Sequence, residues 1–487
     1  MHDDHDSNNP SASGIARRTL LKRAALGIAA GSTSLVSVHA APAEAVTFDV
    51  VVIGAGLSGL TAARDLMTAG LDNFVVLEAR DRVGGRTLNA DIGGGYVSEV
   101  GGEWIGATQT AVVDLAHELG LELFRTYNTG KTAFLSGGEV TLLDVGELVD
   151  SGLAARLDAL AREVPLDAPW SHPRARELDA TTFAQWLAAQ NIPDDQLWSI
   201  STGTMLTFGA PADQLSLLWV LFYVHSAGSY AELEGSAGQG AQAFRVVGGS
   251  QALSQTIARA LGEHVRLDTA VTRVRHWDGS GPVEIETAKG VVRAKRVIMA
   301  LSPSQAHFIG FDPALPSDRA TLQKRWPMAS DMMKAAMVYE KPFWRAAGLS
   351  GQSFMTDAGL YLWAWDNSSP DAGVGVISCF VGPPLGTAMT TQARKAALID
   401  AYVKYLGPDA AHPVHYHDQY WMLERYTKGC VSPLAPGLLS QLGQAVRPTI
   451  GRIEWAGSET ATIWNGYMDG AVRAGHAAAL RALRTNR

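Results

Sequence analysis

The clearest pattern of apolar and polar positions begins at residue 48. Phe48–Ile53 (FDVVVI) is a short apolar run rich in β-branched residues, and a helical pattern follows over Leu60–Ala69. Val75–Leu77 is a second apolar run of strand length, and it ends at Glu78. Short continuous apolar runs are typical of parallel strands that are buried on both faces. The order strand, helix, strand therefore predicts a βαβ unit at the start of the folded chain.

A glycine-rich turn, GAGLSG, joins the first predicted strand to the helix. We expect Gly54 to permit a tight turn, Gly56 to let the backbone approach a pyrophosphate, and Gly59 to let helix and strand pack closely. The N–H groups at the helix N-terminus would bind phosphate, and Glu78 would accept hydrogen bonds from a ribose. A turn without ligand is the alternative, but the strand–turn–helix context and the following acid favour a dinucleotide site.

Length, charge and cysteine content narrow the range of possible domain arrangements and partners. A chain of 487 residues is too long for one simple core, so we expect two domains. The formal net charge of −8 argues against a nucleic-acid partner, because binding phosphates needs a basic face. The two cysteines, Cys379 and Cys430, are too few for a disulfide framework. No Ser-His-Asp, paired-carboxylate or zinc constellation stands out, and we expect no metal.

The first 45 residues have the pattern of an export signal. Arg17-Arg18 opens a twin-arginine motif, the weakly apolar run Ala24–Val38 follows, and small-residue cleavage signals end the segment. A disordered basic tail is the alternative. No other stretch reaches the 18 to 20 apolar residues that a membrane span needs. We expect a signal peptide over 1–45, a mature form without a membrane span, and a periplasmic or secreted location.

The residues after Glu78 distinguish FAD from NAD. The sequence EARDRVGGRT places Arg80, Arg82 and Arg86 around a Gly84-Gly85 pair, where they would offset the charge of a diphosphate. This pattern resembles the extended signature of the flavin amine oxidase family. A second segment, residues 101–106, also resembles the family, at the place where the backbone passes the flavin ring. Its predicted flavin contacts are Gly102, Glu103 and Trp104.

The resemblance covers nearly the whole mature chain and is closest to the monoamine oxidases. It implies an α/β fold, in which a Rossmann-type FAD-binding domain is interleaved with an α+β substrate-binding domain. The resemblance places Val271 beside the adenine. The expected FAD-binding pieces are 46–123, 246–297 and 424–487, and the expected substrate-binding pieces are 124–245 and 298–423.

The strongest local resemblance is at 451–475 (GRIEWAGSETATIWNGYMDGAVRAG). A strand is predicted over Arg452–Trp455, and a helix is predicted to begin near Met468. In the family this helix directs its N-terminus at the flavin N1–C2=O edge, where a positive dipole end stabilises the reduced ring. Before it come three further predicted FAD contacts: Gly457, Ser458 and Glu459.

Tyr467 matches one of two tyrosines that face each other before the flavin in monoamine oxidases, and Val431 stands where the second would be. The resemblance also predicts that Trp421 packs on the ring system and that Gln242 bonds substrate, although Gln242 could equally be satisfied by backbone. The remaining predicted pocket residues are Leu206, Thr207 and Phe308.

Two features bear on the flavin itself. Cys430 matches the cysteine that carries covalent FAD in mammalian monoamine oxidases, and three states are open: a thioether, a free thiol, or a disulfide with Cys379. Family members usually carry a lysine just before the FxPxL turn, bonded through water to flavin N5. Here His307 and Phe308 precede that turn, which puts rapid reoxidation by oxygen in doubt.

The resemblance implies oxidative deamination of an amine by hydride transfer to flavin N5, with O2 or a periplasmic electron carrier as acceptor. An L-amino-acid oxidase, an amine dehydrogenase and a non-enzymatic flavin protein are the alternatives. We expect an aryl-alkyl primary amine, with alkaloid-derived amines open and polyamines last, since no acid stands out to hold a second ammonium. We also expect a homodimer.

Overall fold

The computed structural model describes residues 47–144, 151–235, 240–328, 332–355, 362–370, 372–382, 385–386 and 388–485. The predicted signal peptide over 1–45 lies outside these residues. Ala45–Arg487 form one compact unit. Within the described residues, no helix is both long and apolar enough to cross a membrane.

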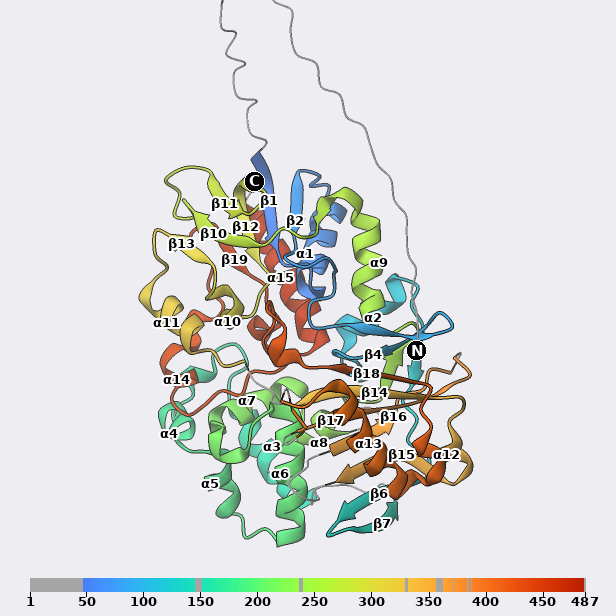
Figure 1. Ribbon diagram of the computed structural model, residues 1–487. Helices are drawn as coiled ribbons and strands as arrows, with labels where there is room; N and C mark the ends of the chain where they lie inside the picture. Colours follow the sequence, from blue (N-terminus) through green and yellow to red (C-terminus); the bar gives the residue numbers. More distant parts are fainter. Residues whose placement is uncertain are drawn as a thin grey trace, which may run out of the picture. The chain divides into compact units, whose positions relative to one another are not determined.

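The first large sheet is built around the βαβ unit that the sequence predicts (Figure 1). Val50 and Val52 pack on one face and Val51 and Ile53 on the other, so both faces of the central strand are buried. The strands run in the order β13 (Gly310–Asp312), β10 (Val271–Arg275), β11 (Val283–Thr287), β12 (Gly290–Met299), β1 (Thr47–Ile53), β2 (Phe74–Leu77) and β9 (Val265–Arg266), and β19 (Ile453–Trp455) pairs with β12.

Helices cover one face of this sheet, and α1 packs closely on α15. Glycine makes this approach possible, because a Cβ added at Gly475 would lie 2.4 Å from the carbonyl oxygen of Ser58. The position of α1 thereby depends on a helix that lies at the far end of the sequence. The covering helices are α1 (Leu57–Thr68), α2 (Thr110–Glu118), α9 (Gln251–Leu261) and α15 (Met468–Thr485).

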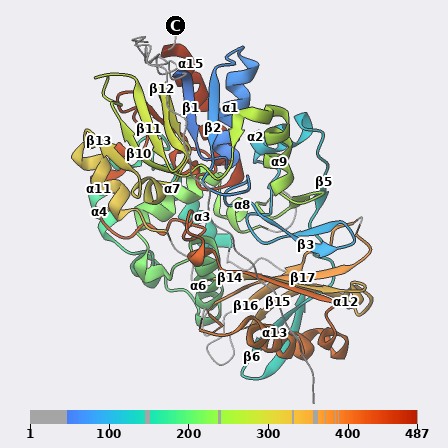
Figure 2. The ribbon, with the colours of Figure 1, turned by 45° about the horizontal axis from the view of Figure 1, so that its top comes forward.

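The second large sheet lies opposite the first in both views (Figure 2). Its strand β14 is buried along its whole length. The strands run in the order β18 (His415–Gln419), β14 (Met333–Tyr339), β17 (Gly375–Val381), β16 (Leu362–Asp366), β15 (Leu349–Met355), β6 (Lys131–Ser136) and β7 (Glu139–Asp144). Helices α12 (Phe343–Ala346) and α13 (Thr391–Leu406) contribute to its core.

A helical layer and two small sheets complete the described fold. The apolar helix α7 is the centre of the layer, and it is buried on nearly every side. Besides the helices already described for the two large sheets, the α-helices are α3 (Ser151–Arg162), α4 (Ala175–Ala180), α5 (Phe183–Ala188), α6 (Asp194–Phe208), α7 itself (Leu217–Ala227), α8 (Tyr230–Glu234), α10 (Pro303–Ala306), α11 (Ser317–Arg325) and α14 (Leu439–Leu442). The small sheets pair β3 (Asn89–Gly93) with β4 (Tyr96–Glu99), and β5 (Leu123–Arg125) with β8 (Phe244–Val246).

The α/β fold is as the sequence predicts, and segments far apart in the sequence alternate between the two large sheets. One segment differs from the expected boundaries. Residues 298–423 were expected in the substrate-binding domain, but β13 pairs in parallel with β10 in the first sheet. A three-residue strand with no sequence signature of its own joins whichever open edge lies beside it, and here that edge is β10.

Candidate active site

A single cavity of about 2330 Å³ runs between the glycine-rich turn and the helical layer, and both large sheets contribute to its wall. Pockets for small ligands usually measure about 300–1,000 Å³, so this one has room for a dinucleotide and a second molecule. Most of the residues predicted from sequence line it: Gly54, Gly56, Glu78, Arg80, Gly85, Arg86, Gly102, Glu103, Trp104, Leu206, Thr207, Gln242, Val271, Phe308, Trp421, Cys430, Val431, Gly457, Ser458, Tyr467 and Met468.

At one end of the cavity the glycine turn has the geometry of a phosphate cradle. Gly54 adopts a φ of +102°, and a Cβ at Gly59 would lie 2.0 Å from the carbonyl oxygen of Gly54. No side chain caps the N-terminus of α1, which leaves N–H groups of the first turn for a ligand. Glu78 accepts a hydrogen bond from the N–H of Ala55 at 2.8 Å, so its carboxylate lies directly beside the turn.

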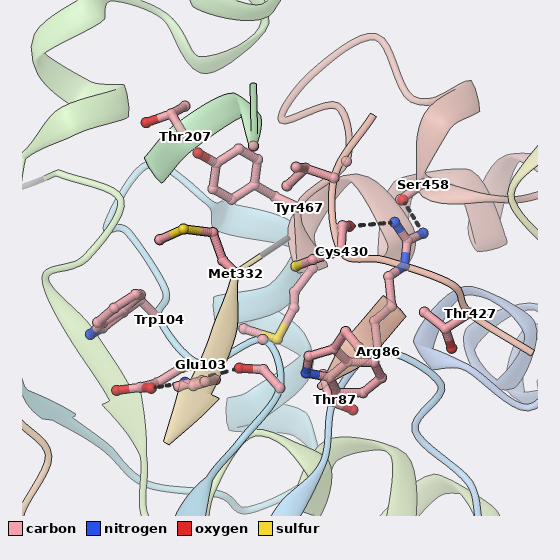
Figure 3. A pocket seen from close by; sticks show the side chains of 18 of the residues that line it. Arg86, Thr87, Glu103, Trp104, Thr207, Met332, Thr427, Cys430, Ser458 and Tyr467 are labelled. Atoms are coloured by element: carbon pink, nitrogen blue, oxygen red, sulfur yellow. Dashed lines mark hydrogen bonds and ion pairs between the residues drawn. The ribbon is translucent and has the colours of Figure 1, made fainter. Parts of the chain in front are cut away.

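The second glycine pair folds back onto this turn. The N–H of Gly84 donates to the carbonyl of Ala55 at 2.9 Å, and both Gly84 and Gly85 have positive φ. Arg86 projects along the cavity wall and donates to the hydroxyl of Ser458 at 2.8 Å (Figure 3). The guanidinium is therefore held in place at the cavity wall, where a diphosphate or a flavin needs positive charge.

Two predicted contacts lie elsewhere. Arg82 is not among the described residues that line the cavity, because its guanidinium turns back and donates to the carbonyl of Gly85 at 3.2 Å. Glu459 also lies behind the wall, and its carboxylate pairs with Arg86 at 2.9 Å. Both residues position groups that reach the cavity. Gly59 does not line the cavity either, in agreement with its expected packing role.

Glu103 and Trp104 belong to a buried cluster that joins the two small sheets to the second large sheet. Glu103 accepts hydrogen bonds from Lys334 of β14 and from the indole of Trp365 at 3.1 Å. Arg245 lies 3.2 Å from Glu103 and 2.5 Å from Glu99. Sequence reasoning assigned no role to Lys334, although a single charge in an otherwise apolar strand was a signal for it.

Trp421 and Cys430 lie along the same wall. The indole of Trp421 donates to the carbonyl of Val100 at 2.8 Å, and the carbonyl of Cys430 accepts from Arg86 at 3.3 Å. No disulfide joins Cys379 and Cys430, so the disulfide alternative is wrong. Burial raises the pKa of the Cys430 thiol, although the charge of Arg86 opposes this.

Aromatic side chains surround the other end of the cavity. Tyr467 lies 4.9 Å from Trp464 and 5.9 Å from Tyr223, measured between ring centroids. Tyr223 lines the cavity from α7, and sequence reasoning missed it because it lies in the continuous apolar run 217–224. Gln242 donates to the carbonyl of Leu233 at 3.3 Å, which fixes its side chain at the same wall.

An acidic residue that sequence reasoning missed also lines this end. Glu234, the last residue of α8, accepts a hydrogen bond from Thr207 at 2.6 Å. Thr207 and Tyr467 lie near each other on one side of the cavity (Figure 3). Phe308, by contrast, lies at an exposed part of the cavity wall, with 61% of its surface accessible and the ammonium of Lys428 at 4.4 Å from its ring centroid.

These features together fit FAD. The glycine turn, Glu78 and the paired arginines suit an adenine dinucleotide, and the wide apolar wall beyond them suits a flavin ring. The family model for flavin containing amine oxidoreductases matches residues 57–483. The chain belongs to this family. Its cofactor is FAD, and its reaction is the oxidative deamination of an amine.

Individual relatives are similar over nearly all of the chain. Flavin-containing amine oxidase B of Bos taurus is 35% identical, over 89% of this chain and 86% of its own length. Putrescine oxidase of Kocuria rosea is 35% identical, over 90% of this chain and 96% of its own length. The solved structure of cyclohexylamine oxidase from Brevibacterium oxydans superposes with a TM-score of 0.82 at 33% identity, covering 91% of this chain and 100% of that chain.

The glycine turn yields a test of the cofactor site. Gly56 has an ordinary φ of −73°, and a Cβ there would meet only the Cα of Gly85, at 3.9 Å. Gly56→Val should therefore fold, but its side chain would fill the space of the pyrophosphate. We expect FAD content to fall at least ~10-fold, equivalent to ~1.4 kcal/mol or more of binding free energy. The measurement is flavin absorbance per chain, with circular dichroism to verify folding.

Gly281→Val is the matched control, because a Cβ at Gly281 would also meet one atom only, at 3.9 Å, and Gly281 does not line the cavity. This variant should keep its flavin. Full flavin content in a folded Gly56→Val protein would contradict the placement of the pyrophosphate.

Proposed function

We propose that this chain oxidises the C–N bond of a small primary amine, which binds between Tyr467 and the flavin, and passes the electrons to O2. The observation that carries the proposal is the continuity of one cavity from the phosphate cradle at Gly56 to Tyr467. Bound FAD supplies the two-electron chemistry by accepting hydride from the amine α-carbon. The resulting imine is hydrolysed by water to an aldehyde and ammonia.

The cavity favours the neutral form of the amine. Burial of an ammonium group among apolar and aromatic side chains lowers its pKa, and only the neutral amine can release hydride readily. Burial also raises the pKa values of the Tyr467 and Tyr223 phenols, which therefore stay uncharged at physiological pH. Uncharged rings offer their negative faces to the amine and orient it by cation–π attraction as it enters.

An amino acid is the less favoured substrate class. Recognition of its carboxylate calls for an arginine beside the reacting carbon. Among the described residues that line the cavity, the arginines are Arg80, Arg86 and Arg425, and Glu424 and Glu459 hold Arg80 and Arg86 at the nucleotide end. Glu234 raises the pKa of the Tyr467 phenol through its charge, and the same charge would repel a carboxylate.

The names of the relatives support oxygen as the electron acceptor, but they do not identify the amine substrate. Amine oxidase B, putrescine oxidase and cyclohexylamine oxidase are all oxidases by name. Putrescine is a diamine, whereas cyclohexylamine carries a single amino group, so similarity to these proteins does not choose between the two substrate classes. The expectation that ranked polyamines last rested on the lack of an acid in the pocket, and Glu234 removes that reason.

Substitution of Tyr467 tests whether the amine substrate binds beside this residue. Tyr467→Ala should lower kcat/KM for amines by about 10–100-fold, equivalent to ~1.4–2.7 kcal/mol, because the ring that orients the amine is lost. The assay follows aldehyde and hydrogen peroxide together, and equal amounts of the two products identify oxygen as the acceptor. Tyr467→Phe is the control that keeps the ring, and it should retain most of the activity. Unchanged kinetics in Tyr467→Ala would reduce this residue to a packing role.

We also propose a thioether between Cys430 and the flavin. Cys430 lines the cavity directly after Gly429, which has a φ of +134° and brings the backbone close to the wall. Acid-precipitated protein should therefore stay yellow, whereas Cys430→Ala should release its FAD into the supernatant. Cys379→Ala is the matched control, because that thiol is buried in β17 away from the cavity. A colourless precipitate from the unmutated protein would refute the linkage and leave the family assignment intact.

Export by the twin-arginine route is a further proposal, supported by Arg17-Arg18 and the apolar run after it. Twin-arginine export carries folded proteins, which suits a chain that must bind FAD before it leaves the cytoplasm. Replacement of both arginines by lysine should keep the activity in the cytoplasmic fraction without lowering the total. The same distribution between cell fractions for both proteins would count against export by this route.

A further inference from the structure

Glu234 is unusual among the acidic side chains of the cavity wall. Glu78 lies 3.7 Å from Arg80, and Glu103 is held between Lys334 and Arg245. Within the described part of the chain, Glu234 has no ion pair with lysine, arginine or histidine. Its one hydrogen bond there comes from the hydroxyl of Thr207, which leaves the negative charge of the carboxylate without compensation.

The fold keeps space for this carboxylate. Gly203 of α6 faces it, and a Cβ added there would lie 3.0 Å from Oε2 of Glu234 and 3.9 Å from the hydroxyl of Tyr230. Thr207, one turn further along α6, donates to Oε1. Oε1 is thus fixed by a hydrogen bond, whereas no described residue donates to Oε2. This oxygen remains available to a donor that enters the cavity.

The surroundings of Glu234 penalise its charge. Burial raises the pKa of this carboxyl, and the hydroxyl of Thr207 opposes the shift only in part. Its position at the end of α8 adds to the penalty, because the last carbonyls of a helix carry negative partial charge. A buried carboxylate in such a place is stabilised when a cation pairs with it.

The other acid of the wall without a basic partner is different. Asp158 accepts a hydrogen bond from the N–H of Tyr230 at 2.8 Å, at the first residue of α8. A carboxylate is favoured at that end of a helix and is a common cap there. Asp158 is therefore explained by the fold, whereas Glu234 is not.

Glu234 also lies on the substrate side of the cavity. Its charge contributes to the raised pKa of the Tyr467 phenol, and its hydrogen-bond donor Thr207 lies near Tyr467 (Figure 3). An amine whose reacting end lies beside Tyr467 can extend toward Glu234. A chain of methylene groups between two nitrogens would then lie along the apolar and aromatic side chains of the cavity that both residues line.

We propose that Oε2 of Glu234 binds the second ammonium group of an aliphatic diamine, so that the carboxylate selects dicationic substrates over monoamines. The proposal rests on the oxidase function proposed above and names its substrate class. The reaction takes place at the other nitrogen. Glu234 is thus a specificity-determining residue, and its removal should alter the recognition of the remote end of the substrate.

The test compares pairs of substrates that differ only at the remote end. For each diamine from 1,3-diaminopropane to 1,6-diaminohexane, the matched monoamine carries a methyl group in place of the second ammonium, as n-pentylamine does for 1,4-diaminobutane. The unmutated holoenzyme should show a kcat/KM at least ~10-fold higher for the best diamine than for its partner, as expected for a charge-assisted hydrogen bond.

Glu234→Gln should lower kcat/KM for that diamine by ~10–100-fold, mainly through KM, and leave the monoamine within about threefold. A damaged active site would lower both together. Glu232→Gln is the matched control, because Glu232 lies on the same helix, accepts from Thr108 at 3.1 Å and does not line the cavity. This control should behave as the unmutated enzyme.

Any of three results would overturn the proposal. The unmutated enzyme could prefer the monoamines, or Glu234→Gln could lose the same activity toward both members of a pair. Alternatively, Glu234→Gln could lose activity toward tyramine but not toward phenethylamine. The last result would identify Glu234 as a partner for a hydroxyl group. Turnover of n-pentylamine or phenethylamine in the same assays would leave the oxidase function standing. A lack of turnover with every amine would instead refute the function itself.

Discussion

Four buried charged side chains hold the wall of the cavity together. Glu99 and Glu103 come from the β4 region, Arg245 from β8 and Lys334 from β14 of the second large sheet. Two carboxylates and two cations balance one another where water cannot reach. Loss of one member of a buried pair typically costs about 3–5 kcal/mol, because its partner is left uncompensated. The position of the second large sheet relative to the two small sheets, and with it the part of the cavity wall formed by Glu103 and Lys334, depends on this network.

Charge is distributed unevenly along the cavity that this network supports. At the nucleotide end, Arg80 and Arg86 are positioned by Glu424 and Glu459, so that the cations face the place of the diphosphate. At the other end the wall is aromatic and carries the carboxylate of Glu234, which has no cation among the described residues. The first arrangement suits an anionic cofactor that stays bound. The second suits a cationic substrate, which enters, loses its proton where it reacts and leaves.

Several residues that do not line the cavity hold in place the groups that do. Arg82 and Glu459 do not reach the cavity, yet one holds the Gly84-Gly85 turn and the other holds Arg86. Gly475 acts at a greater distance, because its missing side chain lets α15 pack against the start of α1. Each of these contacts restricts a group that would otherwise sample several positions, and a fixed group loses less entropy when a ligand binds.

The sequence by itself determined the features that depend on short stretches of backbone. The GxGxxG turn and the strand that ends at Glu78 follow from local spacing, because a tight glycine turn and a continuous apolar run are local properties. Gly54, Gly56 and Glu78 lie in such segments, whereas the family resemblance supplied most of the other predicted cavity residues.

Only the tertiary structure decided which distant side chains meet. Segments far apart in the chain meet where β13 pairs with β10 and where Tyr223 contacts Tyr467. The fold also decides that Glu103 has basic partners, whereas Glu234 has none among the described residues. No local pattern marks Glu234, because it is one of two acids in a five-residue helix and resembles any surface acid. Its character follows from burial and from the absence of a cation among the described residues around it, and both depend on the assembled fold.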